Sequence, residues 1–130
     1  MARQRQCFVA VVDDDVAVRV ALQGLLESHG LKARCFSSAE RFLQSRQRRG
    51  ASCLLLDLRL TGMSGLELLR QLQAGGSSIP SVCLTAEHDS DGRLRSQLLN
   101  AGALEVLSKP FDPEQLLTLV RAALQGVERP

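Results

Sequence analysis

The chain of 130 residues has no tryptophan and no tyrosine, and four phenylalanines are its whole aromatic content. Flavin sites normally recruit aromatic rings, so this scarcity argues against a flavin carrier. No apolar run approaches the roughly 20 residues that cross a bilayer, and residues 1–6 lack the apolar stretch of a secretory signal. We therefore expect a cytoplasmic location without a membrane partner.

The chain also lacks a strong net charge, because 16 Lys and Arg oppose 14 Asp and Glu to give +2. Such a small excess, scattered along the chain, predicts no direct binding to nucleic acid. The one basic cluster, Arg46, Arg48 and Arg49, is interpreted as a solvent-exposed helix end, where cations favour the dipole. Lysine is scarce, since only Lys32 and Lys109 are present.

Four cysteines occur without a Cys-x-x-Cys pair or a nearby histidine. Cys35, Cys53 and Cys83 lie in apolar, strand-like runs, and Cys7 directly precedes one. We predict that all four are reduced, small core residues and that they form neither a metal site nor a redox pair.

Five short apolar runs alternate with longer segments of helical periodicity, and continuous apolar runs of this length are typical of strands covered on both faces. The runs are Phe8–Val12, Ala33–Phe36, Cys53–Asp57, Ser81–Leu84 and Leu104–Leu107. Their alternation with five helices implies right-handed parallel crossovers. The predicted fold class is α/β, a doubly wound, flavodoxin-like five-stranded parallel sheet of order 2-1-3-4-5 with five helices on both faces.

Capping signals mark the ends of the helices. Residues 37–40 and 64–67 both fit the Ser-x-x-Glu capping box, and Asp112 before Pro113 is typical of a helix start. The residues expected to follow the five helices are Gly30, Gly50, Gly75, Gly102 and Gly126. Three apolar stripes are expected to face the core: Val16, Val20, Leu22, Leu25 and Leu26; Leu66, Leu69 and Leu72; and Leu116, Leu119, Val120 and Ala123.

No linker, repeat or low-complexity segment interrupts this pattern before about Gly126. We therefore expect one domain over residues 1–130, with its core over about 8–126 and no output domain in this chain.

Polar side chains are concentrated where the predicted strands end. Asp13–Asp15 follow the first strand, Asp57 ends the third, and Thr85 and Lys109 follow the fourth and the fifth. Ligands of doubly wound sheets bind beyond these carboxyl ends. Taken singly, the acidic run could simply cap a helix, Thr85 is of a type common at strand ends, and Lys109 could be a surface lysine in a turn. Asp57 is harder to explain, because an ionised carboxylate among leucines is costly unless it is paired or metal-bound.

Together these groups predict a specific chemistry. Several close carboxylates repel one another unless a cation lies among them, and a set of oxygen ligands favours Mg²⁺. Lys109 then offers a positive charge to an anion, and Thr85 offers a hydrogen-bond donor. The pattern indicates a site where a phosphoryl group is transferred to a carboxylate.

From Phe8 to Leu124 the sequence resembles the receiver domain of two-component response regulators. The resemblance depends on five motifs: Val11–Asp15, Asp57–Gly65, Leu84–Ala86, Ala101–Ala103 and Lys109–Phe111.

The resemblance implies that Asp57 is the phosphoacceptor. It implies that Asp14, Asp57 and the backbone carbonyl of Arg59 bind Mg²⁺ directly, and that Asp13 does so mainly through water.

It further implies that Thr85 bonds a phosphoryl oxygen and shifts inward on activation, while Lys109 forms an ion pair with that group. Ala86 is small, which leaves the phosphate site accessible. The Lys109–Pro110 peptide bond is expected to be cis, in a turn that directs the lysine inward.

The sequence departs from the family pattern at three places. Thr61 replaces the usual proline and is expected to loosen its loop without touching a metal ligand. Val106 replaces the usual ring on the fifth strand, so loop and helix shifts are the expected readout. Residues 87–92 are longer than usual, and His88 there is expected to be exposed to solvent.

The implied function is that of a signalling domain, not an enzyme acting on an external substrate. A sensor histidine kinase donates the phosphoryl group, and the fourth helix, fifth strand and fifth helix form a responsive, possible homodimer surface. Capping and loop details are similar to receivers of helix-turn-helix transcription factors. Two alternatives remain: a pseudo-receiver that only binds proteins, and a small phosphatase with an aspartyl nucleophile.

Overall fold

The computed structural model describes residues 7–86 and 92–128. Strands and helices alternate along the chain: β1 (Phe8–Val12), α1 (Val16–Ser28), β2 (Ala33–Phe36), α2 (Ala39–Gln44), the 3₁₀ helix η1 (Arg46–Gly50), β3 (Ala51–Asp57), α3 (Gly65–Ala74), β4 (Ser81–Thr85), α4 (Arg93–Asn100), β5 (Glu105–Ser108) and α5 (Pro113–Glu128). All five predicted strands are present. The largest boundary difference is in β3, which begins at Ala51, two residues before the predicted start.

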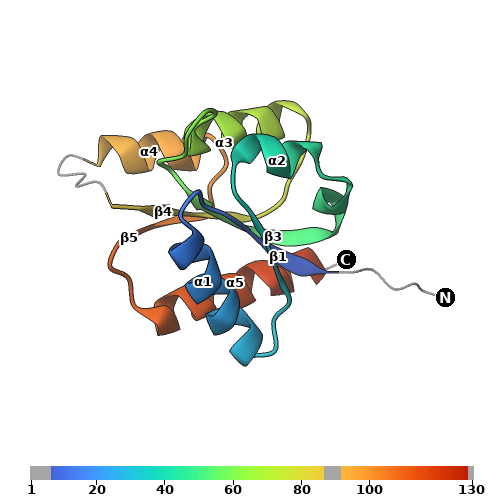
Figure 1. Cartoon of the computed structure of the whole chain (residues 1–130). Coiled ribbons are helices and arrows are strands. Elements are labelled where there is room, and N and C mark those ends of the chain that lie inside the picture. Colours follow the sequence, from blue (N-terminus) through green and yellow to red (C-terminus); the bar gives the residue numbers. More distant parts are fainter. Residues whose placement is uncertain (1–6, 87–91, 129–130) are drawn as a thin grey trace.

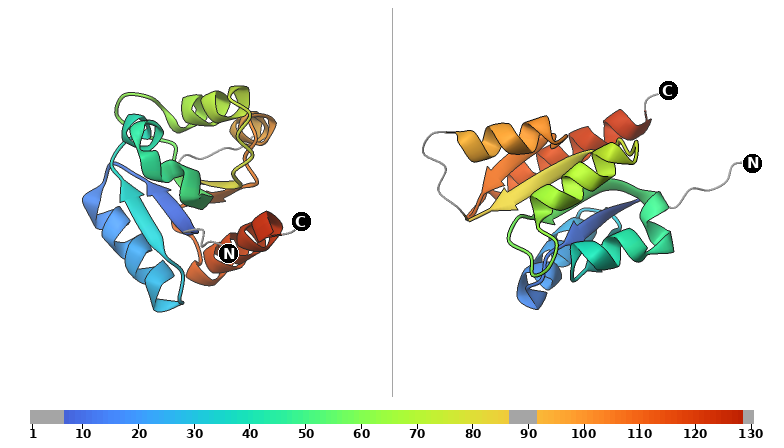
Figure 2. Two further views of the ribbon diagram at one scale, coloured as in Figure 1. Left: turned by 90° about the vertical axis from the view of Figure 1, so that its right-hand side faces the viewer. Right: turned by 90° about the horizontal axis from the view of Figure 1, so that it is seen from above.

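The five strands form one parallel sheet in the order β2-β1-β3-β4-β5. Helices α2, α3 and α4 cover one face, and α1 and α5 cover the other (Figures 1 and 2). The predicted fold class and strand order are therefore confirmed. No helix within the described ranges is both long enough and apolar enough to cross a membrane.

The core has two layers, because side chains of a covered strand alternate between the two faces of the sheet. Leu54 and Leu56 of β3 belong to the cluster under α2, α3 and α4, which also buries Phe42, Leu68 and Leu98. Cys53 and Leu55 belong to the opposite cluster, which also buries Leu22 and Leu26 of α1 and Leu116 and Val120 of α5. Asp57 ends the strand that contributes to both layers, so its backbone is fixed from both faces.

The apolar stripe predicted for α1 is only partly correct. Leu22 and Leu26 are buried, whereas Val16 and Val20 are 62% and 65% exposed. From Val20 to Leu22 the helix turns by about 200°, so the two pairs cannot face the same layer. The stripes predicted for α3 and α5 face the core, with Leu69, Leu72, Leu116, Val120 and Ala123 buried and Leu66 and Leu119 half-buried against it.

The capping predictions differ in outcome. Ser64 and Glu67 form the predicted capping box at the start of α3, and Asp112 Oδ1 accepts from the Glu114 amide at the start of α5. The box predicted at 37–40 is wrong. Ser38 caps α2, because its side-chain oxygen accepts from the Arg41 amide at 3.1 Å. The Glu40 carboxylate accepts from the Met63 amide instead.

Glycine positions explain three further differences. Gly30 and Gly102 take the expected positive φ after α1 and α4, whereas Gly75 has a φ of −85° and Gly76 takes the left-handed conformation instead. Gly50 ends η1, since α2 stops earlier at Gln44. Helix α5 continues through Gly126 to Glu128, because one glycine costs a helix only about 1 kcal/mol.

Two of the four cysteines are core residues as predicted. Cys53 and Cys83 are buried, and burial raises the pKa of each thiol to about 12. Cys35 is half-buried, and burial also raises its pKa. The prediction is wrong for Cys7, which precedes the sheet and is exposed. The basic cluster of residues 46–49 is exposed as predicted, although it forms the separate helix η1.

Candidate functional site

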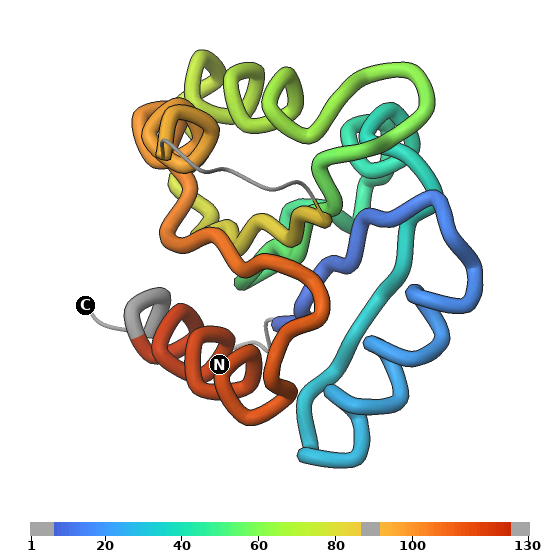
Figure 3. Tube along the Cα trace, turned by 90° about the vertical axis from the view of Figure 1, so that its left-hand side faces the viewer, coloured from blue at the N-terminus to red at the C-terminus, as the bar shows by residue number. Residues whose placement is uncertain are grey.

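Three carboxylates meet at the carboxyl edge of the sheet, which faces the viewer in Figure 3. Asp13 and Asp14 directly follow β1, and Asp57 is the last residue of β3. One oxygen from each of the three carboxylates lies within 4.8 Å of the other two. Asp13 and Asp57 are buried, whereas Asp14 is exposed. Backbone pairing explains the convergence, since β1 and β3 are adjacent and in register up to Val12 and Leu56.

The acidic run after β1 serves two purposes. Asp15 is the N-cap of α1, and its Oδ1 accepts from the Ala17 amide at 2.9 Å. The Asp15 amide donates to Asp13 Oδ1 at 2.9 Å, which restrains the orientation of the Asp13 carboxylate. The Arg19 side chain donates to the Asp13 carbonyl at 2.7 Å and fixes the same turn. Asp15 therefore caps the helix, whereas Asp13 and Asp14 contribute their carboxylates to the cluster.

Lys109 is the cation that faces this cluster. Its Nζ lies 3.7 Å from Asp57 Oδ1 and 3.8 Å from Asp13 Oδ2. The Lys109 amide donates to the Thr85 carbonyl at 2.7 Å, so the ends of β4 and β5 are tied together. The Lys109–Pro110 peptide bond is cis, as the resemblance implied.

The cluster carries more negative charge than its contacts balance. Asp13 is 1% exposed, and its buried Oδ2 has no hydrogen-bond partner among the described residues. Burial raises the pKa of Asp13, and the charge of Asp57 raises it further, against the Asp15 amide and Lys109. Oxygen donors without enough partners are what a hard divalent cation such as Mg²⁺ binds. The residues present therefore fit a divalent metal site.

The remaining predicted residues lie next to the cluster. Thr85 ends β4, is buried, and follows Leu84, the residue paired with Asp57 across the sheet. Ala86 comes next and is exposed. The Arg59 amide donates to Asp57 Oδ1 at 3.3 Å, so the carboxylate and the loop after β3 are in contact.

Thr61 contacts the cluster directly, although the sequence led us to expect that it touches no metal ligand. Its amide and its hydroxyl both donate to Asp14 Oδ2, at 3.3 and 3.2 Å. The signal available for Thr61 was that a threonine offers two donors where a proline offers none. The sequence also did not reveal that Glu40 contacts the same loop, where its Oε2 accepts from the Met63 amide at 2.8 Å. The predicted exposure of His88 concerns a residue outside the described ranges.

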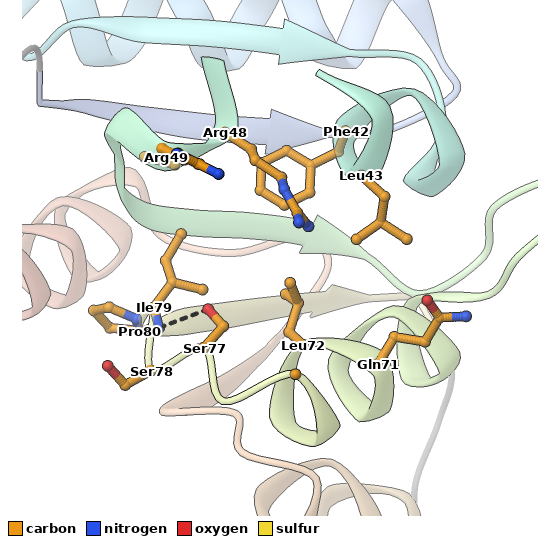
Figure 4. A pocket seen from close by; sticks show the side chains of 12 residues that line it. Phe42, Leu43, Arg48, Arg49, Gln71, Leu72, Ser77, Ser78, Ile79 and Pro80 are labelled. Carbon is orange, nitrogen blue, oxygen red and sulfur yellow. Dashed lines mark hydrogen bonds between the residues drawn. The ribbon is translucent and has the colours of Figure 1, made fainter. Parts of the chain in front are cut away.

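A cavity of about 630 Å³ lies away from these carboxylates. Its lining includes Phe42, Arg48, Leu72 and Ile79, whose side chains Figure 4 shows around it. Ala51, at the start of β3, also lines the cavity, and Asp57 is six residues further along the strand, about 20 Å away at 3.3 Å per residue. The cavity and the acidic cluster are therefore separate features.

Comparisons with known proteins give the same family throughout. The model of the family described as "Response regulator receiver domain" matches residues 9–121. The chain is 40% identical over 121 residues to response regulator protein TodT of Pseudomonas putida, covering 93% of this chain and 52% of TodT. It is also 40% identical over 116 residues to transcriptional regulatory protein FixJ of Azorhizobium caulinodans, covering 89% and 54%. The chain thus spans about half the length of these relatives.

Solved structures agree with the sequence relatives. Response regulator StyR superposes with a TM-score of 0.81 at 42% identity, covering 92% of this chain and 60% of that chain. The structure titled FixJ-N has a TM-score of 0.81 at 32% identity and covers 95% and 96%. A CheY-like receiver domain protein of Methanospirillum hungatei has a TM-score of 0.83 at 25% identity. The chain belongs to the receiver-domain family of two-component response regulators.

Proposed function

We propose that Asp57 accepts a phosphoryl group and that the site serves as the switch of a two-component regulator. The observation that supports this most directly is the cluster of Asp13, Asp14 and Asp57 with Lys109 opposite, in a chain of this family. Asp57 is the carboxylate that both Lys109 and the Arg59 amide approach. It is also the carboxylate at which the family resemblance places the phosphoacceptor.

The proposed resident metal is Mg²⁺, held by Asp13, Asp14, Asp57 and the backbone carbonyl of Arg59. When bound, Mg²⁺ neutralises charge on the transferring oxygens and so lowers the barrier to attack by an anionic nucleophile. Asp13 Oδ2 supports this assignment, because it is a buried oxygen without a hydrogen-bond partner among the described residues, and a bound metal would provide that partner.

In the proposed reaction an Asp57 carboxylate oxygen attacks the phosphorus of a phosphohistidine on a sensor histidine kinase. The phosphorus–oxygen bond forms as the phosphorus–nitrogen bond breaks, and the leaving imidazole nitrogen takes a proton from solvent. Lys109 pairs with the new dianionic group, the Thr85 hydroxyl donates to it, and the small Ala86 leaves room for its approach. Positioning and electrostatics supply most of the rate. Water then hydrolyses the acyl phosphate, so the domain catalyses only its own phosphorylation and dephosphorylation.

The proposed output is control of transcription by a longer cytoplasmic protein, with residues 1–130 as its receiver domain and no DNA contact from this domain. The relatives named as transcriptional regulators support this proposal. We place a homodimer surface on α4, β5 and α5. Leu99 and Leu104 support it, because they are 38% and 48% exposed beside the ion pair of Arg95 and Glu105 at 2.6 Å.

The test is labelling by acetyl phosphate with Mg²⁺, followed by intact mass and a phosphate-affinity gel. We expect one phosphoryl group per chain on the wild type, labile to acid and base, and none on Asp57→Asn or in EDTA. Asp15→Asn is the matched control, because Asn still caps α1; it should label like the wild type.

Other outcomes separate the alternatives. Unchanged labelling of Asp57→Asn would refute the assignment of the phosphoacceptor. A wild type that neither binds Mg²⁺ nor becomes labelled would indicate a pseudo-receiver. Repeated turnover of a phosphate ester would indicate a phosphatase.

A further inference from the structure

The loop after β3 reaches across the sheet edge to the loop after β1. Thr61 donates twice to one oxygen of Asp14, through its amide at 3.3 Å and its hydroxyl at 3.2 Å. These residues are 47 positions apart in the sequence. Both bonds use Oδ2, and neither uses Oδ1. The carboxylate is therefore held at one oxygen while the other keeps its lone pairs for a further ligand.

We propose that Thr61 is a positioning residue that holds Asp14 in the geometry required for metal binding. This inference deepens the proposed function and rests on it. Asp14 needs such a support more than its two partners do. It is the exposed member of the cluster, whereas burial restricts Asp13 and Asp57. Repulsion from two neighbouring carboxylates favours rotamers that turn Asp14 away into water, and the two donors oppose that rotation.

A residue can position another only if its own backbone is fixed, and the loop of Thr61 is fixed at both ends. Gly65 N donates to the Leu58 carbonyl at 3.3 Å and closes the loop. Glu40 of α2 accepts from the Met63 amide at 2.8 Å. That hydrogen bond lowers the pKa of Glu40, so its carboxylate is the form that holds the loop.

Gly62 completes the anchor. Its φ is +80°, and a Cβ there would lie 2.6 Å from Glu40 Oε2. Only a glycine lets the backbone approach the carboxylate this closely in this conformation. The path of contacts therefore runs from α2 through the loop to Thr61 and then to Asp14.

The side chain of Thr61 can be tested separately from its backbone. Thr61→Val keeps the shape and the amide but removes the hydroxyl, whereas Thr61→Ser keeps both donors. We expect Thr61→Val to weaken the Kd for Mg²⁺ about threefold, near the lower end of the net effect of an ordinary hydrogen bond, because these two bonds are long and exposed. Thr61→Ser should restore the Kd to within a factor of about 1.5 of the wild type.

The assay is titration of the full chain with MgCl₂, followed by calorimetry and by the shift in Tm. Thr118→Val is the control substitution, because its hydroxyl donates to the Glu114 carbonyl on the exposed side of α5, outside the cluster. A structural role alone would lower the Tm in EDTA and leave the Kd unchanged. The positioning role predicts that Thr61→Val leaves the Tm in EDTA unchanged and weakens the Kd for Mg²⁺.

The outcomes distinguish this inference from the proposed function. Equal or tighter Mg²⁺ binding by Thr61→Val overturns the inference while the wild type still binds the metal. A Kd for Thr61→Ser as weak as that of Thr61→Val also overturns it, because the hydroxyl would then not be the cause. No Mg²⁺ binding by the wild type overturns the proposed function itself.

Discussion

Asp13→Asn should stabilise the metal-free protein while weakening its response to magnesium. Asp13 is 1% exposed, and its Oδ2 has no hydrogen-bond partner among the described residues. An asparagine keeps the acceptor used by the Asp15 amide at 2.9 Å. It also removes one charge and offers an N–H₂ group to the neighbouring Asp57.

The magnitude follows from the contacts. Two unit charges at the cluster's 4.8 Å limit repel by about 3.5 kcal/mol at an effective dielectric of about 20. The attraction between Lys109 Nζ and Asp13 Oδ2, which are 3.8 Å apart, is about 4 kcal/mol at the same dielectric. These two contributions nearly cancel. Repulsion from Asp14 is screened more, because that carboxylate is exposed, and it acts in the same direction as the desolvation of the buried, incompletely bonded oxygen, which therefore decides the sign. That penalty is about 1–3 kcal/mol. We expect Asp13→Asn to gain about 1–2 kcal/mol, a rise in Tm of about 3–8 °C for a domain of this size.

The effect should depend on pH in a defined direction. Folding raises the pKa of Asp13 above its usual 3.8. The folded state therefore binds this proton more tightly, and the penalty is complete only above the folded pKa. As pH falls through the folded pKa and then below 3.8, the wild type loses the penalty, and the difference in Tm between the two proteins should disappear.

Thermal unfolding in EDTA and in excess MgCl₂ tests this prediction. A metal that binds only the folded state adds about 2.7 kcal/mol at 100 times its Kd, so the wild type should gain more than Asp13→Asn. Asp15→Asn is the control, because this exposed residue caps α1 and asparagine caps equally well. A lower Tm for Asp13→Asn in EDTA, or an equal magnesium shift in both proteins, would refute the reasoning.

Two further predictions concern the fold. Gly62→Ala should lower the free energy of unfolding in urea more than Gly76→Ala. Both glycines have a positive φ, but a Cβ at Gly62 would lie 2.6 Å from Glu40 Oε2, so the Glu40 side chain would have to shift and lose its hydrogen bond from the Met63 amide. We expect a loss of about 1 kcal/mol for Gly76→Ala and about 1 kcal/mol more for Gly62→Ala, and equal losses would contradict the close contact. With an excess of a thiol reagent at pH 8, exposed Cys7 should react within minutes, whereas Cys53 and Cys83, with pKa values of about 12, should react only on unfolding; rapid reaction of all thiols in the native protein would show that the core is open.

The fold was largely predictable because its strands are covered on both faces. A strand such as β3 must be apolar throughout, so its sequence is a continuous run that needs no knowledge of its neighbours. The rotation of α1 was less predictable, because Val16 and Val20 are as apolar as the leucines beside them. Only the position of the sheet decides which side of that helix is buried.

The cluster could be predicted for a related reason. Parallel strands end at one edge, so residues that follow β1 and β3 must meet there wherever they lie in the sequence. The contacts of Thr61 and Glu40 could not be derived in this way. They connect loops and a helix end, whose relative positions follow from packing and not from strand register. Glu40 was instead assigned to a local capping box, because its local sequence gives no sign of a partner 23 residues away.

The geometry also bears on how a switch can work with Val106 in place of a ring. Val106 is half-buried, packs on the core under α4, and pairs with Cys83 in β4. Its small side chain leaves little that could rotate between two positions. The ends of β4 and β5 are nevertheless coupled through the Lys109 amide and the Thr85 carbonyl, at 2.7 Å. Where the backbone of Lys109 shifts as its side chain pairs with a new dianion on Asp57, this bond must lengthen or Thr85 must move with it, and the first outcome loses a short hydrogen bond. We therefore expect the response to pass through the backbone of these two strand ends to α4, as a shift between two existing conformations.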